Sequence, residues 1–448
     1  MSTPSELEAL SLEGLSASAR LVSLELKLAA DKAAGFSSKP TGEVNNHIHT
    51  VYSFSPYTPA EAAYGAWRSG LDAAGIIDHE SVSGCDEMLQ AGKLIGMPIT
   101  TGCELRVDTA GTALEGRRIN NPDSLGLIYM VFHGIPHQNR HIVDDFLKPI
   151  RESRNKRMRE QVGILNGVLR DADLPELDFD ADVVSISMSS EGGSITERHI
   201  LFALAKKMAD KFGRGEKLLS AMKASLNLTV PPTIVERLSN PDNPHFLYDL
   251  LGLFKGTLVP KFFKQPDKAE CPPVKEATAL ADRVGAIPAY AYLGDVGESP
   301  TGDKKAEAFE DAWLDVLFEE LPKLGYRAVT YMPPRNTKAQ LARIKAKCAE
   351  KDLMEISGVD INSSRQSFRC PEVTLPEFVH LNDRTWSLIA HEHLASQGGP
   401  GLFDPSSPMA DAPLDIRLDV YARMGRRMDP FKPETIIDLA RKEGLWTK

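Results

Sequence analysis

Hydrophobic positions follow two different periods along the first third of the chain. Some segments place apolar residues at helical spacing, while others are short apolar runs of the kind that form buried strands. The helical patterns cover about residues 14–35, 58–70 and 83–96, and the strand patterns cover a run ending at 49 and the ranges 71–78, 98–107 and 125–134. Strands separated by helices predict parallel pairing with crossover connections.

The helix predicted over 58–70 has the clearest boundaries. Thr58 is a favourable N-cap, Glu61 stands three residues later as in a capping box, and Pro59 takes the first helical position. Gly70 closes the segment. These signals place one helix between the first two strands.

The alternation stops between residues 139 and 275, where helical patterns dominate, and then resumes. The later strand patterns cover 286–294, 326–332 and 353–361, and the later helical patterns cover about 304–324 and 337–351. No Gly-rich nucleotide turn follows the first strand. The order therefore favours an α/β barrel of parallel strands with a helical insertion over an open doubly wound sheet.

Composition places the chain among globular proteins. It has 448 residues, 42% hydrophobic and 25% charged, enough for one large α/β domain with insertions or for two or three ordinary domains. No apolar run approaches the roughly 18 residues of a membrane span. The first residues are acidic where a signal peptide would be basic, so we expect a cytoplasmic protein without a membrane partner.

Charge and cysteine content exclude further classes of function. The net charge of -10 opposes a surface that binds duplex nucleic acid, although a local basic pocket for one phosphate is compatible with it. The five cysteines contain no Cys-x-x-Cys pair, so neither a disulfide framework nor a thiolate zinc knuckle is indicated. The oligomeric state is not predicted.

Histidines and one carboxylate follow or end successive strands. His47 and His49 end the first strand, His79 follows the second, Glu104 lies in the third and His133 ends the fourth. In a parallel α/β barrel the carboxyl ends of the strands meet at one mouth, so these side chains are expected to converge. Imidazole and carboxylate ligands together suit zinc, manganese or iron. Asp78, beside His79, either orients a ligand or is a ligand itself.

Three segments in this order resemble the opening motifs of the PHP superfamily, the polymerase and histidinol phosphatase domain. They are "NNHIHTVYSFSP", "AWRSGLDAAGIIDHESVSGCDEM" and "TGCELRV". Two later segments, "RHILFALAKKM" and "GVDINSSRQ", are similar to a histidine-bearing helix and to the closing motif of its small phosphoesterases. The resemblance covers residues 43–138 closely, and about 195–210 and 285–368 more loosely.

The resemblance implies a distorted TIM-like (β/α)7 barrel with two or three divalent metal ions, zinc, manganese or iron, at its mouth. Residues 1–40 would then form a helical extension, 41–138 the first part of the barrel, 139–275 a mainly helical insertion, and 276–448 the second part with C-terminal helices. The insertion is expected to pack over or beside the barrel.

The resemblance also implies a set of metal ligands. His47 and His49 would bind one metal with Asp360, Glu104 would bridge two metals, His79 and His133 would bind the second, and His199 would take a third or shared position. Two positions depart from the family pattern, since Ser55 and Asn362 stand where stronger ligands are usual. His137, His391 and His393 are reserve candidates, the last two in a segment that reads as helical.

A phosphate beside the metals would need cationic or polar donors. Arg198, Arg335 and Arg365 lie in segments expected at the mouth, and Asn362 is assigned to substrate contact with them. The run "RESRNKRMR" is adequately explained as the charged face of a long helix.

The leading hypothesis is a metal-dependent phosphoesterase that hydrolyses a small phosphorylated metabolite or nucleotide. Glu104 and Asp78 would be its catalytic carboxylates, and a hydroxide shared by two metals would attack phosphorus. Two alternatives remain. One is a barrel that cleaves a C–N bond, as in amidohydrolases, which also open with His-x-His. The other is a non-catalytic regulatory or binding protein, which the replacements at Ser55 and Asn362 would favour.

Overall fold

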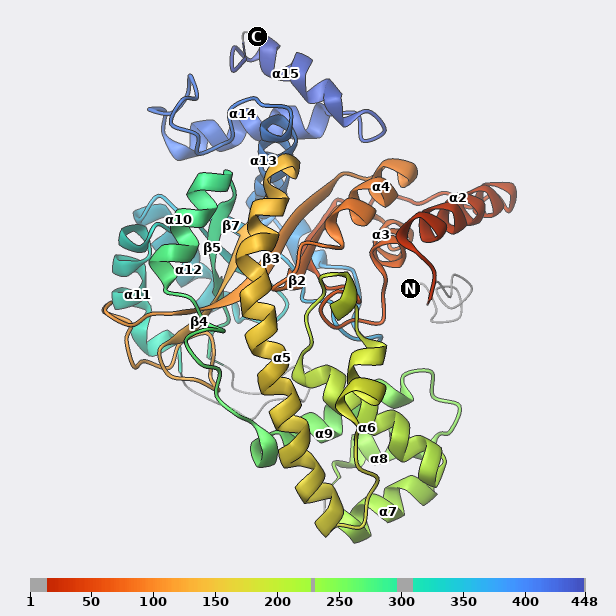
Figure 1. Ribbon diagram of the computed structural model, residues 1–448. Helices are drawn as coiled ribbons and strands as arrows, with labels where there is room; N and C mark the ends of the chain where they lie inside the picture. The colour runs from red at the N-terminus through yellow and green to blue at the C-terminus, as the bar shows by residue number, and fades with distance from the viewer. Residues whose placement is uncertain (1–13, 227–229, 296–308, 447–448) are drawn as a thin grey trace.

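A computed structural model describes residues 14–226, 230–295 and 309–446. Its seven strands form one sheet in chain order (Figure 1). The strands are β1 Glu43–Ile48, β2 Leu71–His79, β3 Ile99–Asp108, β4 Leu127–His133, β5 Ile287–Tyr292, β6 Ala328–Tyr331 and β7 Met354–Ser357. Each strand predicted from the sequence is present.

The first and last strands approach each other and nearly close the sheet. The amide of His49 donates to the carbonyl of Ile361 at 3.0 Å, and the amide of Ile361 donates to the carbonyl of His47 at 3.2 Å. The side chain of Asn45 also bonds both backbone groups of Val359. The molecule is therefore a mixed α/β protein with a distorted TIM-like barrel, and the predicted fold class is confirmed.

One expectation about the barrel is wrong, because β4 runs antiparallel to both of its neighbours. Residues 109–126, between β3 and β4, contain no helix. A parallel crossover needs a helix or a similarly long return, whereas this connection only reverses the chain. The carboxyl end of β4 therefore lies at the opposite edge of the sheet from the carboxyl ends of β2 and β3.

The helices cover the barrel and extend beyond it. They are α2 Ala17–Ala33, α3 Pro59–Arg68, α4 Cys85–Ile95, α5 Arg140–Asp171, α6 Glu197–Phe212, α7 Glu216–Leu226, α8 Pro232–Ser239, α9 Phe246–Phe262, α10 Val274–Val284, α11 Leu314–Glu320, α12 Lys338–Glu350, α13 Val379–Ser396, α14 Leu414–Arg427 and α15 Ile436–Lys442. The capping box of Thr58 and Glu61 opens α3 as predicted.

The helix predicted over about 304–324 is shorter in the structure. Residues 304–308 lie outside the described residues, and α11 covers only Leu314–Glu320. The carboxylate of Asp295 accepts the backbone N–H groups of residues 309–311, which starts a short 3-10 turn there. A 3-10 turn over Pro322–Leu324 follows α11 directly, and Gly325, in the left-handed region at φ 91°, ends the segment.

The hydrophobic residues form two cores. One fills and surrounds the barrel, and the other lies within the insertion, between the second half of α5 and helices α6 to α9. Phe54, from the loop after β1, belongs to the core of the insertion. In Figure 1, α5 runs alongside the sheet and continues to α6–α9, at the far end from α13–α15. The insertion therefore meets the barrel through α5 and the loop after β1.

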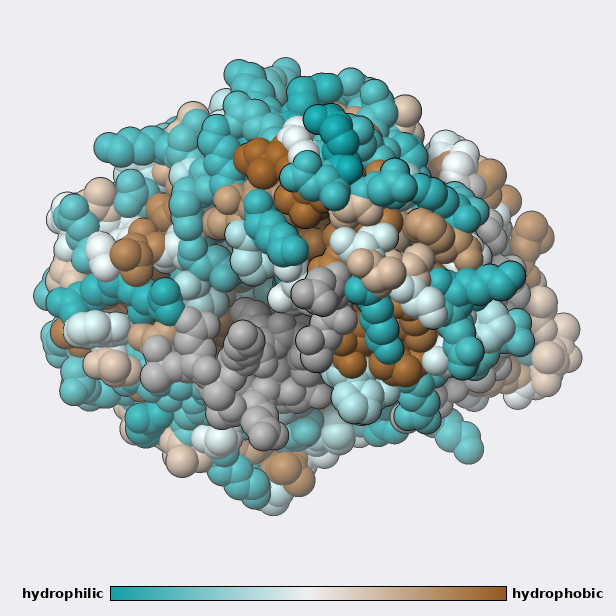
Figure 2. All heavy atoms as spheres, turned by 90° about the horizontal axis from the view of Figure 1, so that it is seen from below, coloured by the Kyte–Doolittle hydropathy of each residue, from teal (hydrophilic) through white to brown (hydrophobic). Residues whose placement is uncertain are grey.

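The face seen in Figure 2 is mainly hydrophilic, with separate hydrophobic patches rather than one continuous band. Among the large exposed apolar side chains, Val22 and Leu26 lie one turn apart on α2, whereas Phe431 lies in a loop near the C-terminal helices. Among the described residues, no helix is both long enough and apolar enough to cross a membrane.

Candidate metal centre

Three of the predicted ligands meet at the mouth of the barrel. One side-chain ligand atom from each of His47, His49 and Glu104 lies within 4.8 Å of the others, and all three side chains are buried. The two histidines come from the end of β1, and Glu104 comes from β3, two strands away. Within the described parts of the chain, this is the one group of three acidic, histidine or cysteine side chains that meets this distance criterion.

The segment after β7 completes this group with Asp360. Its Oδ1 lies 3.2 Å from Nε2 of His49. Gly358 permits the close approach, because a Cβ there would lie 2.5 Å from Cβ of His47 and 2.8 Å from its backbone nitrogen. Pairing of β1 with residues 359–361 thus holds Asp360 beside the two histidines.

Asp78 fixes the orientation and tautomer of His49. Its carboxylate accepts three hydrogen bonds, from the amide and hydroxyl of Thr50 at 2.7 and 2.6 Å and from the hydroxyl of Ser53 at 2.6 Å. Since Ser53 gives its proton to Asp78, its oxygen accepts from Nδ1 of His49, 3.2 Å away. The proton therefore sits on Nδ1, and Nε2 presents a lone pair. This geometry favours the orienting role for Asp78, while its ligand and catalytic roles stay predictions.

In this tautomer Nε2 of His49 and a carboxylate oxygen of Asp360 face each other as two acceptors. Such a contact at 3.2 Å is unfavourable unless a cation or a proton lies between them. Burial opposes charge on His49, but the carboxylates of Asp360 and Glu104 raise its pKa above the usual value. Burial likewise opposes charge on Asp360, and His49 nevertheless lowers the pKa of this carboxyl. The donor set of imidazole nitrogen and carboxylate oxygen fits a divalent zinc, manganese or iron ion.

His79 lies against the same group. Its ring stacks on that of His49 with centroids 4.6 Å apart, and its Nδ1 lies 3.0 Å from Oε2 of Glu104. Burial favours the neutral form of Glu104, but His79 and the two β1 histidines lower the pKa of its carboxyl. Glu104 is therefore an anion at neutral pH, as a metal ligand should be.

His133 lies deeper in the barrel than predicted. Because β4 is antiparallel, His133 pairs with Gly102, two residues before Glu104 on β3. Burial, with a further contribution from His47, lowers the pKa of His133 to about 3. Its Nε2 is buried and has no hydrogen-bond partner among the described residues. Its role as a metal ligand stays a prediction.

His199 and Arg198 lie at the start of α6. Nδ1 of His199 accepts the backbone N–H of Thr196 at 3.0 Å, which closes a capping box and leaves the proton on Nε2. Burial, reinforced by Arg154, lowers the pKa of His199 to about 3, so the ring is neutral. A protonated Nε2 donates hydrogen bonds, whereas metal binding would need its lone pair. The cap therefore favours a donor role for His199 over the predicted ligand role.

Arg198 is a cation close to the cluster. Its charge helps to lower the pKa of Asp360, after the larger effects of burial and of the two β1 histidines. Its side chain is partly exposed and makes no hydrogen bond or ion pair with the other described residues. It is thus available to an anion at the mouth.

The other predicted substrate residues already have protein contacts. Arg365 forms a bidentate ion pair with Asp249 of α9, which ties the closing loop to the insertion. Nδ2 of Asn362 donates to Oδ1 of Asp360 at 2.6 Å. Nε of Arg335 donates to the carbonyl of Leu293, at the carboxyl end of β5. Their substrate contacts stay predictions.

The run "RESRNKRMR" contains functional candidates that the sequence reading missed. Arg151, Arg154 and Arg157, spaced three residues apart on α5, are buried rather than solvated. Arg154 pairs with Glu80, directly after His79, and with Glu197, directly before Arg198. Buried apolar residues one helical turn away, Leu147 before Arg151 and Met158 after Arg154, could have indicated a buried face.

Two further residues continue this charged network toward the mouth. Arg106, two residues beyond Glu104 on β3, pairs with Glu270, which also binds Arg157 through two hydrogen bonds of 2.6 Å. Tyr129 of β4 stands opposite Arg106, with its ring centroid 6.1 Å from that of His79. Because β4 is antiparallel, Tyr129 lies two residues beyond the level of Glu104, whereas His133 lies two residues before it.

The reserve histidines lie at the other end of the barrel. His391 and His393 of α13 contact the carbonyls of Gly134 and Ile99. Nε2 of His137 lies 3.1 Å from Glu392, whose carboxylate also accepts the amide of Thr101. These contacts attach α13 to the amino-terminal ends of the strands, far along β3 from Glu104. Ser55 is buried, and its hydroxyl has no partner within the described part of the chain.

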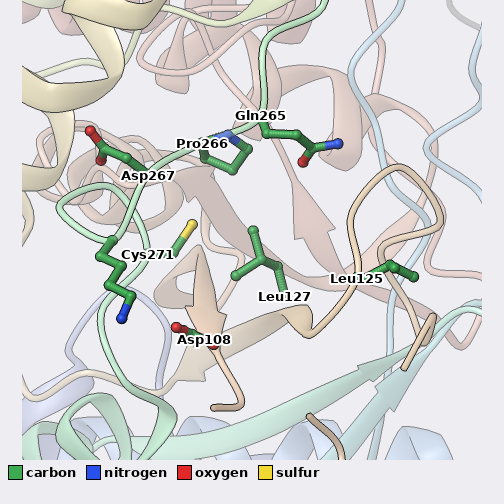
Figure 3. A pocket seen from close by; sticks show the side chains of 8 residues that line it. Asp108, Leu125, Leu127, Gln265, Pro266, Asp267 and Cys271 are labelled. Atoms are coloured by element: carbon green, nitrogen blue, oxygen red, sulfur yellow. The ribbon is translucent and has the colours of Figure 1, made fainter. Parts of the chain in front are cut away.

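A separate pocket of about 450 Å³ lies beyond the rim, where β3 ends and β4 begins (Figure 3). Asp108, Leu125 and Leu127 line one side, and residues 265–268 with Cys271 line the other. Burial raises the pKa of the Cys271 thiol to about 12, so this thiol is unreactive at neutral pH. None of the predicted site residues lines this pocket.

Comparison with known proteins finds limited similarity. No protein-family model matches the chain. A 5'-3' exoribonuclease of Haemophilus influenzae is 30% identical over 80 residues, which are 18% of this chain and 27% of that protein. The similarity thus spans about a quarter of the length of that relative.

Two solved structures show a distant likeness. One, from Bifidobacterium adolescentis, carries a provisional assignment as a metal-dependent phosphoesterase, and has a TM-score of 0.47, 19% identity, and coverage of 77% of this chain and 98% of that one. The other is an amidohydrolase from Chromobacterium violaceum with bound sulfate and no metal, with a TM-score of 0.47, 16% identity and coverage of 73% and 90%. At these scores neither likeness carries an argument about activity.

Proposed function

We propose that the protein is a metal-dependent phosphoesterase that hydrolyses a small phosphorylated molecule. The observation that carries this proposal is Arg198, a cation without an ion-pair partner in the described structure, whose charge acts on the carboxylate of Asp360 and helps to lower its pKa. A guanidinium there can hold two oxygens of a phosphate against the candidate metal centre. The resemblance of the opening motifs to the PHP superfamily points to the same chemistry.

His47, His49, Glu104 and Asp360 are the residues that would hold the metal, with His79 against them. A bound divalent ion supplies Lewis-acid activation of water and neutralises charge on the phosphoryl oxygens. The predicted second ion would draw on His133, whereas this proposal gives His199 the role of a hydrogen-bond donor in place of the predicted third-ion ligand.

The residues around the cluster have distinct tasks in this proposal. Glu104, ionised at neutral pH, accepts a hydrogen bond from the attacking water and orients it. Arg198 holds the phosphoryl oxygens. His199 donates from Nε2 toward the oxygen of the leaving group, and its low pKa keeps it a neutral donor. Water forms a new P–O bond and releases one proton to solvent, the ester P–O bond breaks, and the leaving oxygen receives a proton from solvent.

The amide-cleaving alternative shares most of the metal ligands. It lacks a specific observation in its favour, whereas the arginine and the N–H donor at α6 suit a phosphate. The similarity to a 5'-3' exoribonuclease, an enzyme of phosphodiester cleavage by its name, supports phosphoester chemistry over a short part of the chain.

The test is phosphate release from a panel of phosphate monoesters by metal-loaded protein, with amide substrates assayed in parallel. We expect phosphate release that is lost on chelation and falls by orders of magnitude in Glu104→Gln. Asp72→Asn, on the same sheet but distant from the mouth, is the matched control and should retain activity. Cleavage of amides without phosphate release would favour the C–N hydrolase, and neither activity would favour a binding protein.

A further inference from the structure

An aromatic cluster lies beside the candidate metal centre, where the loop after β1 meets the insertion. Phe54 packs edge-on against His199 with ring centroids 5.0 Å apart. Phe202 of α6 and Tyr248 of α9 lie 5.9 and 6.0 Å from Phe54 and 5.2 Å from each other. Phe54 is buried, while Phe202 and Tyr248 are only partly buried, so the cluster presents aromatic surface.

The position of this cluster is set by the same elements that position the centre. Phe54 directly follows Ser53, which bonds His49. Arg198 and Phe202 are four residues apart on α6 and therefore share one face of the helix, one turn or about 5.4 Å along the axis. A phosphate bound at Arg198 would thus lie one helical turn from the aromatic surface of Phe202, a separation that a sugar can span.

We propose that Phe202 and Tyr248 bind a planar aromatic group joined to the phosphate of the substrate, so that the protein prefers nucleotide-type esters to aliphatic sugar phosphates. This inference rests on the proposed phosphoesterase function and specifies its substrate class. Aromatic side chains bind nucleotide bases by stacking. Stacking uses the flat face of the base rather than the hydrogen-bond donors and acceptors at its edge.

The loop that carries Phe54 is fixed on both sides, which makes the cluster a formed surface rather than a chance contact. The amide of Val51 donates to the carbonyl of Tyr57 at 2.9 Å, and the amide of Ser194 donates to the carbonyl of Tyr52 at 2.8 Å. The second bond joins the loop to the residues just before α6. Phe54 therefore has a fixed position, and its ring packs against those of Phe202 and Tyr248.

The first test compares adenosine 5′-monophosphate with ribose 5-phosphate as substrates of the metal-loaded full chain. We expect kcat/KM for the nucleotide to exceed that for the sugar phosphate by about tenfold or more. Phe202→Leu and Tyr248→Leu keep apolar volume but remove the aromatic face, and each should bring the ratio toward one. Phe212→Leu, at the other end of α6, is the matched control and should leave the ratio unchanged.

The second test measures binding of the same two esters by calorimetry, which does not depend on turnover. Tighter binding of the nucleotide, reduced in Phe202→Leu, is the expected result. Equal binding of both esters, or equal losses for both in the variants, would overturn the aromatic-site inference while leaving the phosphoesterase proposal intact. If no ester released phosphate, the proposed function would fail, and the binding comparison would still decide the inference.

Discussion

Replacing Ser53 by alanine tests the hydrogen-bond relay that prepares His49. The change removes the acceptor of the Nδ1 proton and one of the three hydrogen bonds to Asp78, while both bonds from Thr50 remain. His49 is 1% exposed, so water cannot easily replace the lost partner. A buried donor without a partner costs about 1 to 3 kcal/mol.

The magnitude expected for metal binding follows from that cost. Without Ser53, the Nδ1–H tautomer of His49 has no acceptor for its proton and is no longer favoured over the other tautomer. The tautomer with a protonated Nε2 cannot bind a metal through that nitrogen. Every 1.4 kcal/mol is a factor of ten, so the cost corresponds to about 10- to 100-fold weaker binding, which is the usual effect of removing a residue that orients a ligand. The free energy of unfolding should fall by about 1 kcal/mol, because one neutral hydrogen bond is lost.

The assay is titration of metal-stripped Ser53→Ala with Zn²⁺, compared with wild type and with the control Asp72→Asn. Asp72 lies on β2 like Asp78 but bonds the backbone of Gly42, away from the mouth. Unchanged metal affinity in Ser53→Ala, with the fold intact, would refute the relay.

Three other changes probe the elements that hold the mouth together. Gly358→Ala should destabilise the protein and weaken metal binding, because its Cβ would collide with His47 in the barrel closure. Arg154→Met should lower the free energy of unfolding by about 3 to 5 kcal/mol in denaturant titrations, since it leaves the carboxylate of Glu197 with one cation fewer in a buried network. Burial raises the pKa of Glu310 to about 8, so its carboxyl is protonated when folded at neutral pH, and its contribution to stability is lost as the pH rises toward and through 8. In thermal melts, Glu310→Gln should therefore lose less stability between pH 6 and 9 than wild type.

The Arg154 and Glu310 changes have matched controls, and each of the three changes has a result that would contradict it. Arg159→Met removes an exposed ion pair on the same helix as Arg154 and should change stability by less than about 1 kcal/mol. An equal effect of the two arginine variants would contradict the buried network. A normal thermal midpoint and metal affinity in the Gly358 variant would contradict the tight closure. Parallel pH profiles for wild type and the Glu310 variant would contradict the raised pKa, and Glu319→Gln, exposed on α11, should leave the profile as it is.

The sequence predicts the barrel and the centre of the site because their signals are local. The histidines stand at the recognisable end of β1 and Glu104 lies within the apolar run of β3, and the alternation of helices and strands indicates which strands bring such residues together. The capping box of Thr58 and Glu61 depends only on residues three apart, and it is present as predicted.

The direction of β4 could not be read from its own residues. An antiparallel strand has the same apolar pattern as a parallel one when both faces are covered, and the informative segment is the connection at 109–126, which lacks a helical pattern. This single reversal places His133 two residues before the level of Glu104 and Tyr129 two residues beyond it.

Contacts between segments far apart in the chain could not be predicted from the sequence either. Arg154 is indistinguishable from a solvated helix residue until its partners Glu80 and Glu197 are placed, because a buried charge depends on long-range pairing. Arg365 follows Asp360 in a segment that predicts phosphate contact, and only the fold places Asp249 of the insertion beside it. The tautomer of His199 likewise depends on the cap of α6 rather than on the residue itself.

The central claim is that His47 and His49 form the core of a metal centre with Glu104. Its most direct test is the stoichiometry of Zn²⁺ bound to metal-stripped wild type and to the double variant His47→Ala/His49→Ala, measured by equilibrium titration. We predict at least one tightly bound ion per wild-type chain and loss of that ion in the double variant, while the variant remains folded. Equal amounts of metal bound with equal affinity by both proteins would contradict the claim.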